Sequence, residues 1–317
     1  MTQAIELRNL RKIYKTTFRG KTIEALGGIS LEVARGEVFG LLGPNGAGKT
    51  TTVKILLDLT RATEGSAEIL GIPTSDPKSR AKVGYLPEGH KFPGYLTARQ
   101  TLSIFGRMSG METADIERRV MPLLEQLRIA EWADVRVKKF SKGMTQRLGI
   151  ASALIHEPEV LFLDEPTDGV DPVGRREIRD ILKEEAAKGR TIFLNSHLLS
   201  EIELMCDRTA ILRKGKIAAA GRIDELTRTG STYKVKTWGM PDNLADMLRE
   251  AGAGIERANG HLVLNVRDVE HLNQLIDEMR ANGGLIEEIT PIKSTLEDVF
   301  VDLVKAADLE SAEETQS

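Results

Sequence analysis

The sequence predicts an α/β domain over residues 1–225 and a small α+β domain over residues 230–305. Short apolar strands alternate with helical segments through the first two-thirds of the 317 residues, which is the order typical of α/β proteins. A glycine-rich loop joins one of these strands to a helix. The last third has strand and helix signals in the order β-α-β-β-α-β, the split pattern of ferredoxin-like domains.

The composition is that of a soluble globular protein, with 41% hydrophobic and 29% charged residues. Lys and Arg number 44 against 47 Asp and Glu, so there is no basic excess and no nucleic-acid partner is expected. A single cysteine, Cys206, excludes an internal disulfide and favours a cytoplasmic location. No apolar run approaches the roughly 18 residues that span a bilayer, so membrane association is expected only through a partner.

Hydrophobic periodicity sets the elements of the first domain. Alternating apolar residues predict strands around Ile5–Leu7 and Ile29–Val33. Short apolar runs predict buried strands, and a turn at Lys214-Gly215 predicts a hairpin of two more strands. The buried strands are Val38–Leu42, Val83–Leu86, Val160–Leu163 and Thr191–Leu194. The hairpin strands are Asp207–Leu212 and Lys216–Ala220. A helix is expected at Thr50–Leu59.

A polar, helical insertion is expected between the strands of this domain, as a helical subdomain over about residues 96–157. Pro122 and Trp132 are expected to interrupt its helices.

In the second domain, turn residues separate the predicted elements. Strands are expected at Thr232–Thr237, from Ile255, at Leu262–Val266 and at Leu285–Thr290, helices at Leu244–Ala251, Val269–Met279 and Ser294–Lys305, and a hairpin at Asn259-Gly260. Residues 306–317 are expected to form an acidic flexible tail. The domain has no paired catalytic set, which favours an interaction or regulatory module.

The strongest motif is Gly43-Pro44-Asn45-Gly46-Ala47-Gly48-Lys49-Thr50, which has P-loop spacing, follows an apolar strand and opens a helix. Its glycines allow backbone N–H groups to surround phosphates, and the helix N-terminus favours an anion. Lys49 supplies a charge for the β- and γ-phosphates, and the Thr50 hydroxyl is a ligand for Mg²⁺. The motif therefore predicts a nucleoside triphosphate with Mg²⁺.

A second motif places two carboxylates, Asp164 and Glu165, at the end of the apolar strand Val160–Leu163. Asp164 in such a position can hold Mg²⁺ or its water. Glu165 beside it can take a proton from an attacking water. An acid that merely caps a turn before Pro166 is the alternative.

Four further features each have an ordinary structural explanation when taken alone. Ser141 is a good helix N-cap, Asp168–Pro172 reads as a turn, His197 follows a strand, and Glu88 lies in a loop rich in proline and glycine.

Taken together and in order, residues 4–221 resemble the nucleotide-binding subunit of ABC transporters. Gly43–Thr51, ending in Thr50 and Thr51, looks like its Walker A, and Leu161–Glu165 looks like Walker B with its catalytic Glu. Phe140–Arg147 resembles the signature sequence, Asp168–Asp171 the D-loop, and His197 the switch histidine. Tyr14 stands where the family places an adenine-stacking aromatic, although an ordinary strand-end aromatic explains it nearly as well.

The sequence departs from the family pattern at two places. Glu88 replaces the Q-loop glutamine; an ionised Glu accepts hydrogen bonds but cannot donate them, and it could still ligate Mg²⁺. The signature carries Lys142 and Met144, while Ser141 and Gly143, which would meet the γ-phosphate, are retained. This variant, like the segment Ser294–Phe300, is similar to sequences of bacterial drug-export ATPases.

The resemblance implies an ATPase that uses ATP and Mg²⁺ and works as a head-to-tail homodimer. ATP would lie between the P-loop of one copy and Ser141 and Gly143 of the other. Glu165 would orient and deprotonate the attacking water, His197 would hold the γ-phosphate, and Asp171 would report across the interface.

The chain would energise a separate transmembrane permease, lying peripherally on the inner face of the cell membrane. Its permease contacts would include the loop Glu88–Tyr95 and the helical segment after it, with His90, Lys91, Phe92 and Tyr95 as candidates. An ordinary exposed loop explains these four residues equally well. An exporter is the leading hypothesis. An importer, and a soluble ABC-type ATPase not involved in transport, remain alternatives.

Overall fold

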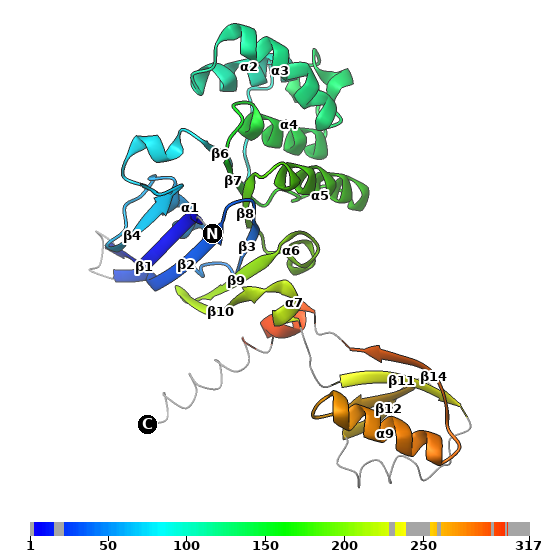
Figure 1. Cartoon of the computed structure of the whole chain (residues 1–317). Helices are drawn as coiled ribbons and strands as arrows, with labels where there is room; N and C mark the ends of the chain where they lie inside the picture. The colour runs from blue at the N-terminus through cyan, green and yellow to red at the C-terminus, as the bar shows by residue number, and fades with distance from the viewer. Residues whose placement is uncertain are drawn as a thin grey trace. The chain divides into compact units, whose positions relative to one another are not determined.

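The computed structural model describes residues 3–15, 22–227, 232–238, 254–258, 261–292, 295–301 and 303. The chain divides into two compact units, Met1–Ile223 and Asp224–Ser317 (Figure 1). The first unit contains two sheets and the second unit one, and each unit has its own hydrophobic core.

The first unit is built on a six-stranded sheet with the order β10-β9-β3-β8-β7-β6. The strands are β3 (Val38–Leu42), β6 (Val83–Leu86), β7 (Val160–Asp164), β8 (Thr191–Asn195), β9 (Arg208–Arg213) and β10 (Lys216–Arg222). All neighbours are parallel except β10, which closes the predicted hairpin with β9. The carboxyl ends of β3, β7 and β8 therefore lie at one edge, where ligands bind in open α/β sheets.

A second, antiparallel sheet has the order β2-β1-β4-β5. Its strands are β1 (Gln3–Lys15), β2 (Thr22–Ala34), β4 (Glu64–Ile69) and β5 (Ile72–Pro73). Its inner face, helix α1 (Lys49–Leu56) and the six-stranded sheet share one core, in which Phe39, Phe162 and Phe193 are fully buried. The Phe193 ring lies 5.7 Å from Phe39 and 5.3 Å from Phe162. This core fixes α1, and with it the glycine-rich loop, against the sheet.

The helical part contains α2 (Ala98–Met108), α3 (Thr113–Gln126) and α4 (Lys142–Leu154), which lie together at one end of this unit in Figure 1. Short 3-10 turns stand at Pro77–Arg80, Ala130–Trp132 and Val137–Lys139. Thr97 and Gln100 form a capping box at the start of α2. The expected break at Pro122 is wrong, because Pro122 lies inside α3. The buried residues Val120 and Leu123 hold the helix through it, so packing outweighs one missing backbone hydrogen bond.

Helices α5 (Pro172–Ala187), α6 (Leu199–Met205) and α7 (Ile223–Leu226) complete the first part of the chain. Helix α5 follows the predicted D-loop and α6 follows His197, so both begin near the carboxyl edge of the sheet. None of the helices in the described ranges combines the length and the apolar character that crossing a bilayer takes.

The second unit contains a four-stranded antiparallel sheet with the order β12-β13-β11-β14. The strands are β11 (Thr232–Trp238), β12 (Gly254–Ala258), β13 (His261–Asn265) and β14 (Leu285–Pro291), and α9 (Val269–Ala281) packs its apolar side on the sheet. Strands β11 and β12 are both antiparallel to β13 and so parallel to each other, as a split β-α-β unit requires. Residues 296–301 are helical. The expected helix Leu244–Ala251, the turn Asn259-Gly260 and residues 306–317 lie outside the described residues.

Candidate active site

The glycine-rich loop leaves the buried strand β3 and ends at α1. Gly43 and Gly48 have φ values of 150° and 112°, which L side chains rarely adopt. A Cβ on Gly43 would lie 2.3 Å from the Leu212 carbonyl oxygen, and one on Gly48 would lie 2.6 Å from the Ala25 carbonyl oxygen. A Cβ on Gly46 would meet nothing within 4 Å. Both ends of the loop therefore pack closely against backbone carbonyl groups, while its middle has free space around it.

We expect Gly43→Ala to lower both stability and nucleotide affinity, because the loop must shift away from the Leu212 carbonyl. Gly189→Ala is the matched control, since Gly189 has a φ of 90° but nothing within 4 Å of a new Cβ. The control isolates the conformational cost, about 1–2 kcal/mol. Urea unfolding of both variants measures the difference. Equal losses of unfolding free energy would show that the loop accommodates the methyl group without strain.

Lys49 is the first residue of α1 and is only 7% exposed. Its Nζ donates to the Gly43 carbonyl at 2.6 Å and to the Pro44 carbonyl at 3.3 Å, so the ammonium lies within the curve of the loop. Burial lowers the pKa of Lys49, and the negative charges of Glu165, Asp164 and Glu88 oppose that shift. The lysine thus faces the carboxylates that the sequence assigns to hydrolysis.

The other loop residues lie where a phosphate chain could reach them. Pro44, Asn45, Gly46 and Thr50 are exposed, Thr51 is half-buried, and Ala47 packs into the core.

Asp164 ends β7 and is 3% exposed. Burial raises its pKa to about 6, with further raising by the charges of Glu88 and Glu165. The Asn195 amide, which donates to Asp164 Oδ1 at 2.6 Å, and the Lys49 charge act in the opposite direction. A nearby cation would relieve this concentration of negative charge.

Glu165 and His197 are in direct contact. The Glu165 Oε1 atom accepts from the His197 backbone N–H at 2.8 Å and lies 2.7 Å from the His197 Nδ1 atom. The Glu165 Oε2 atom accepts from the Ser196 hydroxyl at 3.0 Å. Glu165 itself has a φ of 51°, an uncommon backbone conformation that its N–H bond to the Asn195 carbonyl supports. The carboxylate is buried at 7% exposure, while the His197 side chain is 55% exposed.

Glu88 lies exposed in the loop after β6, where the family pattern has glutamine. Its charge acts on Asp164 and Lys49. It also contributes, after burial and the charge of Asp164, to raising the pKa of Tyr85 to about 12. The site therefore gathers Lys49, Asp164, Glu88, Glu165 and His197.

The residues assigned to the signature and D-loop form a second group. Ser141 caps α4 by accepting from the Met144 N–H at 3.2 Å, and Asp171 caps α5 by accepting from the Gly174 N–H at 2.9 Å. Backbone hydrogen bonds, that of Gly174 first, lower the pKa of Asp171. Gly143 stands near Val170, since a Cβ there would lie 3.6 Å from its side chain. This group is built from the starts of α4 and α5.

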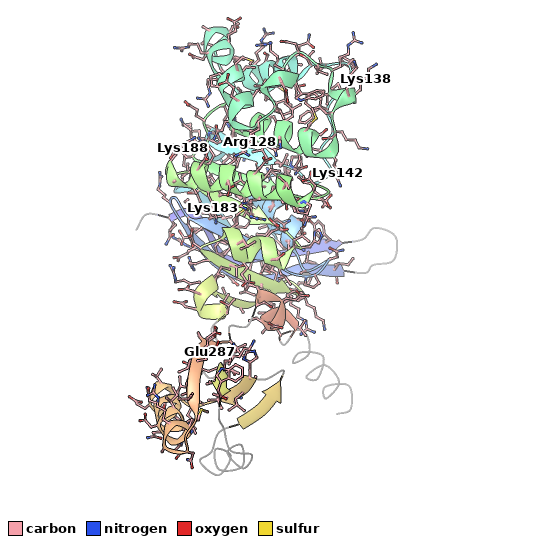
Figure 2. The ribbon with its side chains drawn as sticks, turned by 90° about the vertical axis from the view of Figure 1, so that its right-hand side faces the viewer. Arg128, Lys138, Lys142, Lys183, Lys188 and Glu287 are labelled. Atoms are coloured by element: carbon pink, nitrogen blue, oxygen red, sulfur yellow. The ribbon has the colours of Figure 1, made fainter. Side chains whose placement is uncertain are left out.

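Two contacts hold the signature helix to its surroundings. Lys142, labelled in Figure 2 at the start of α4, donates from Nζ to Asp168 Oδ2 at 2.9 Å. Gln146 donates to the Glu165 backbone carbonyl at 3.0 Å. Helix α4 is thus connected directly to the backbone of Glu165.

Tyr14 lies on β1, opposite Ile23 of β2, and is 36% exposed. The Lys12 Nζ lies 4.8 Å from its ring centroid. An accessible ring of this kind can stack on a base, and its assignment to adenine stays a prediction.

The donor set at the carboxyl edge fits Mg²⁺ together with phosphates. Mg²⁺ prefers oxygen ligands and usually takes one or two carboxylates plus substrate phosphates and waters. Asp164, Glu88 and the Thr50 hydroxyl supply oxygens of that kind. No group of three or more His, Cys, Asp or Glu in the described residues could hold a metal ion alone, so the phosphates would have to complete the site.

Sequence reasoning missed Asn195 and Ser196, which contact Asp164 and Glu165 directly. The available signal was two polar residues at the end of the apolar run Thr191–Leu194, because strand ends in a parallel sheet meet at the ligand edge.

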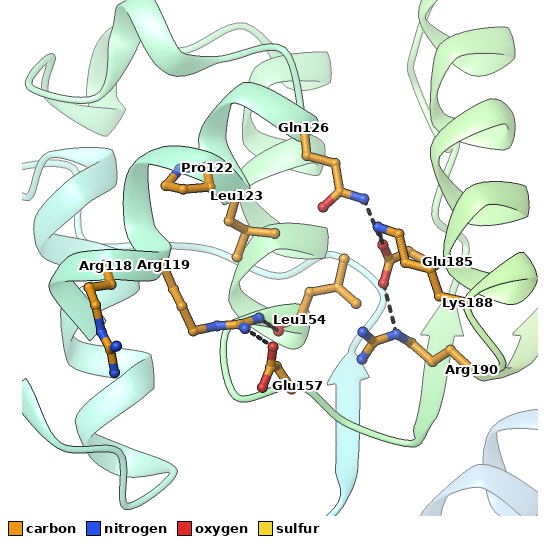
Figure 3. Close-up of a pocket in the computed structure, with 10 residues that line it drawn as sticks. All are labelled: Arg118, Arg119, Pro122, Leu123, Gln126, Leu154, Glu157, Glu185, Lys188 and Arg190. Atoms are coloured by element: carbon orange, nitrogen blue, oxygen red, sulfur yellow. Dashed lines mark hydrogen bonds and ion pairs between the residues drawn. The ribbon is translucent and has the colours of Figure 1, made fainter. Parts of the chain in front are cut away.

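A pocket elsewhere in this unit is lined by residues of α3, α4, α5 and the turns after them (Figure 3). Its charged side chains, Arg118 excepted, pair with one another. Arg119 contacts Glu157, and Glu185 pairs with Lys188 at 2.6 Å and with Arg190 at 2.8 Å. Arg118 pairs with Asp115 outside the pocket. The charged groups that line the pocket are therefore already used in ion pairs, and we assign the pocket no ligand.

Comparisons with known proteins agree with this geometry. Residues 26–168 match the sequence model of the ABC transporter family. An uncharacterised ABC transporter ATP-binding protein of Synechocystis is 36% identical over 309 residues, covering 94% of this chain and 83% of that protein. The Nod factor export ATP-binding protein I of Cupriavidus metallidurans is 36% identical over 308 residues, covering 96% and 98%.

A solved ATP-binding cassette also has a fold similar to that of this chain. A dimeric ATP-binding cassette in a post-hydrolysis state, bound to ADP and Pi, superposes with a TM-score of 0.62 at 26% sequence identity, covering 69% of this chain and 98% of that one.

Proposed function

This chain belongs to the ATP-binding subunits of ABC transporters, and we propose that it hydrolyses ATP to energise export through a separate transmembrane permease. The observation that carries the proposal is the meeting of Lys49, Asp164, Glu165 and His197 at the carboxyl edge of one sheet. Cation, metal-binding carboxylate, base and histidine are the groups that phosphoryl transfer to water needs.

In the proposed reaction, the loop's backbone N–H groups and Lys49 hold the phosphates of ATP, with Thr50 at the start of α1. Mg²⁺, when bound, neutralises the charge on the phosphate oxygens. Glu165 accepts the proton of the attacking water, and its Oε1 atom is held by the His197 backbone N–H. His197, with Nδ1 toward Glu165, has its exposed edge available to the γ-phosphate.

We propose further that two copies enclose the nucleotide head to tail. Ser141, Gly143 and Asp171 lie at the starts of α4 and α5, whereas the glycine-rich loop leads into α1. A solved ATP-binding cassette with a similar fold is dimeric, which supports a dimer of this chain. The bound γ-phosphate would then hold the two copies together, and hydrolysis would release them.

Export rather than import is supported by the relative named as a Nod factor export ATP-binding protein, which this chain matches over nearly its whole length. The similarity of Ser294–Phe300 to drug-export ATPases adds to this. The small second domain would be the interaction or regulatory module of such a subunit. We keep for it the bounds predicted from the sequence, residues 230–305.

In the predicted permease loop, Glu88–Tyr95, some side chains pack against the protein and others are exposed. His90 is held by α4, with Nε2 3.2 Å from the Thr145 carbonyl, and its ring contacts Phe92. Phe92 packs in turn on Phe105 of α2. Lys91 is exposed and Tyr95 is 73% exposed. Tyr95 is therefore the stronger candidate for permease contact, and His90 and Phe92 would shape the loop.

The direct test is to tag this chain, isolate it from native membranes in mild detergent and identify what co-purifies. A polytopic membrane protein in about equal amount is the expected partner. Recovery with soluble partners alone, such as ribosomes or DNA, and no membrane-bound pool would replace transport by a soluble ATPase function.

We expect Tyr95→Ser to reduce the amount of co-purifying permease at least about fivefold, because exposed tyrosines at interface centres commonly contribute more than 1 kcal/mol. Basal ATP hydrolysis by the isolated chain should be unchanged. The matched control is Leu59→Ser, since Leu59 is 64% exposed and lies outside this loop. Equal recovery of permease with both variants would remove Tyr95 from the interface.

A further inference from the structure

Two neighbouring residues at the end of β8 each donate a hydrogen bond to one of the two carboxylates at the end of β7. Strands β7 and β8 are parallel, and their register places Asp164 opposite Asn195. The Asn195 Nδ2 donates to Asp164 Oδ1 at 2.6 Å, and the Ser196 Oγ donates to Glu165 Oε2 at 3.0 Å. One dipeptide at the end of β8 thus contacts both groups of the proposed chemistry.

The contacts of Ser196 define where its proton goes. Its hydroxyl oxygen accepts from the Leu198 backbone N–H at 3.1 Å. A hydroxyl has one proton, and an ionised carboxylate can only accept, so that proton is directed to Glu165. Ser196 is 3% exposed, so water does not compete freely for this bond. The hydroxyl therefore restricts the rotation of the Glu165 carboxylate.

The amide of Asn195 is oriented by its hydrogen bond to Asp164. An ionised Asp164 accepts only, so Nδ2 faces it and Oδ1 is left as the second polar atom of the amide. Within the described residues, this buried Oδ1 has no hydrogen-bond partner. Buried polar atoms are nearly always paired, and an unpaired acceptor beside a metal-binding carboxylate suits a water held by the metal or phosphate.

We propose that Asn195 and Ser196 are positioning residues, Asn195 holding Asp164 for Mg²⁺ and Ser196 holding Glu165 for the attacking water. The proposal rests on the proposed ATPase function. In a merely structural role, the two hydrogen bonds would only stabilise the end of the sheet. A structural role predicts lower stability on mutation, whereas a positioning role predicts separate effects on metal binding and on turnover.

Ser196 is tested by comparing Ser196→Ala, Ser196→Thr and Ser152→Ala in ATP hydrolysis. Ser196→Ala should lower kcat about tenfold with KM for ATP unchanged, because partners that orient reactive groups commonly contribute 10–100-fold. Ser196→Thr keeps the hydroxyl and should restore kcat. Ser152→Ala removes another buried hydroxyl, bonded to the Gly149 carbonyl in α4, and should leave kcat unchanged. An unchanged kcat in Ser196→Ala, or no rescue by threonine, would overturn the assignment.

Asn195 is tested by nucleotide binding rather than activity. Affinity for a non-hydrolysable ATP analogue is measured for Asn195→Leu with Mg²⁺ and again with EDTA. The Mg²⁺-dependent affinity should fall at least about tenfold, with the metal-free affinity retained. Thr209→Val, which removes a buried hydroxyl bonded to the Gly40 carbonyl in the same sheet, is the control. Equal change in both affinities, or in neither, would contradict the role.

The two failures are distinguishable. If the wild-type chain binds the analogue but hydrolyses no ATP, the proposed function fails. If the wild-type chain hydrolyses ATP while Asn195→Leu and Ser196→Ala behave like it, only the positioning assignment fails.

Discussion

Replacing Glu165 with glutamine is expected to reduce the rate of ATP hydrolysis at least about 100-fold while ATP still binds. Glutamine has nearly the shape of glutamate, and its Oε1 can still accept hydrogen bonds from the His197 N–H or the Ser196 hydroxyl. It has no basic oxygen to take a proton from water. Phosphate release at saturating ATP measures the first effect, and equilibrium binding of ATP measures the second.

The control for this prediction is Glu184→Gln, which removes a carboxylate from the exposed surface of α5. That variant should hydrolyse ATP as the wild type does. Turnover by Glu165→Gln within a few-fold of wild type would mean that another group activates the water.

Lys49→Ala is expected to weaken ATP binding by about 10–100-fold, since hydrogen bonds to charged groups contribute about 1.5–3 kcal/mol. The lysine lies inside the loop, bonded to the Gly43 and Pro44 carbonyls, and it faces the carboxylates at the end of β7. Without it, phosphates entering the loop would meet the charges of Asp164 and Glu165 with one cation fewer. Isothermal titration with Mg-ATP measures the change in affinity.

Lys54→Ala is the matched control, because Lys54 is an exposed lysine in the last turn of the same helix. Its removal should leave ATP affinity within twofold of wild type. Normal affinity in Lys49→Ala would contradict the phosphate-cradle assignment and leave the loop as a structural turn.

Local signals in the sequence are sufficient for several strands of the six-stranded sheet and for the loop. Val38–Leu42 and Val83–Leu86 have the bounds that their apolar runs predicted. Glycine spacing predicted the loop because the conformations it needs are specific to glycine, as the φ values of Gly43 and Gly48 illustrate. The break expected at Pro122 is absent because core packing holds its helix, and a local rule does not include core packing.

The contacts that organise the site were not predictable in the same way. Asn195 and Asp164 are 31 residues apart and meet only through the register of β7 and β8. The contact of Gln146 with the Glu165 carbonyl likewise depends on where α4 packs. The sequence could name Glu165 and His197 as functional residues, but it did not predict that they would be in contact.

In the proposed dimer, ATP is shared between the loop of one copy and Ser141 of another. The most direct test is the molar mass of the Glu165→Gln chain with Mg-ATP, measured by light scattering with and without Ser141→Arg. ATP is expected to double the mass of Glu165→Gln, and Ser141→Arg is expected to keep the chain monomeric although each copy still binds ATP. An ATP-bound monomer without the arginine, or an unchanged dimer with it, would contradict the shared site.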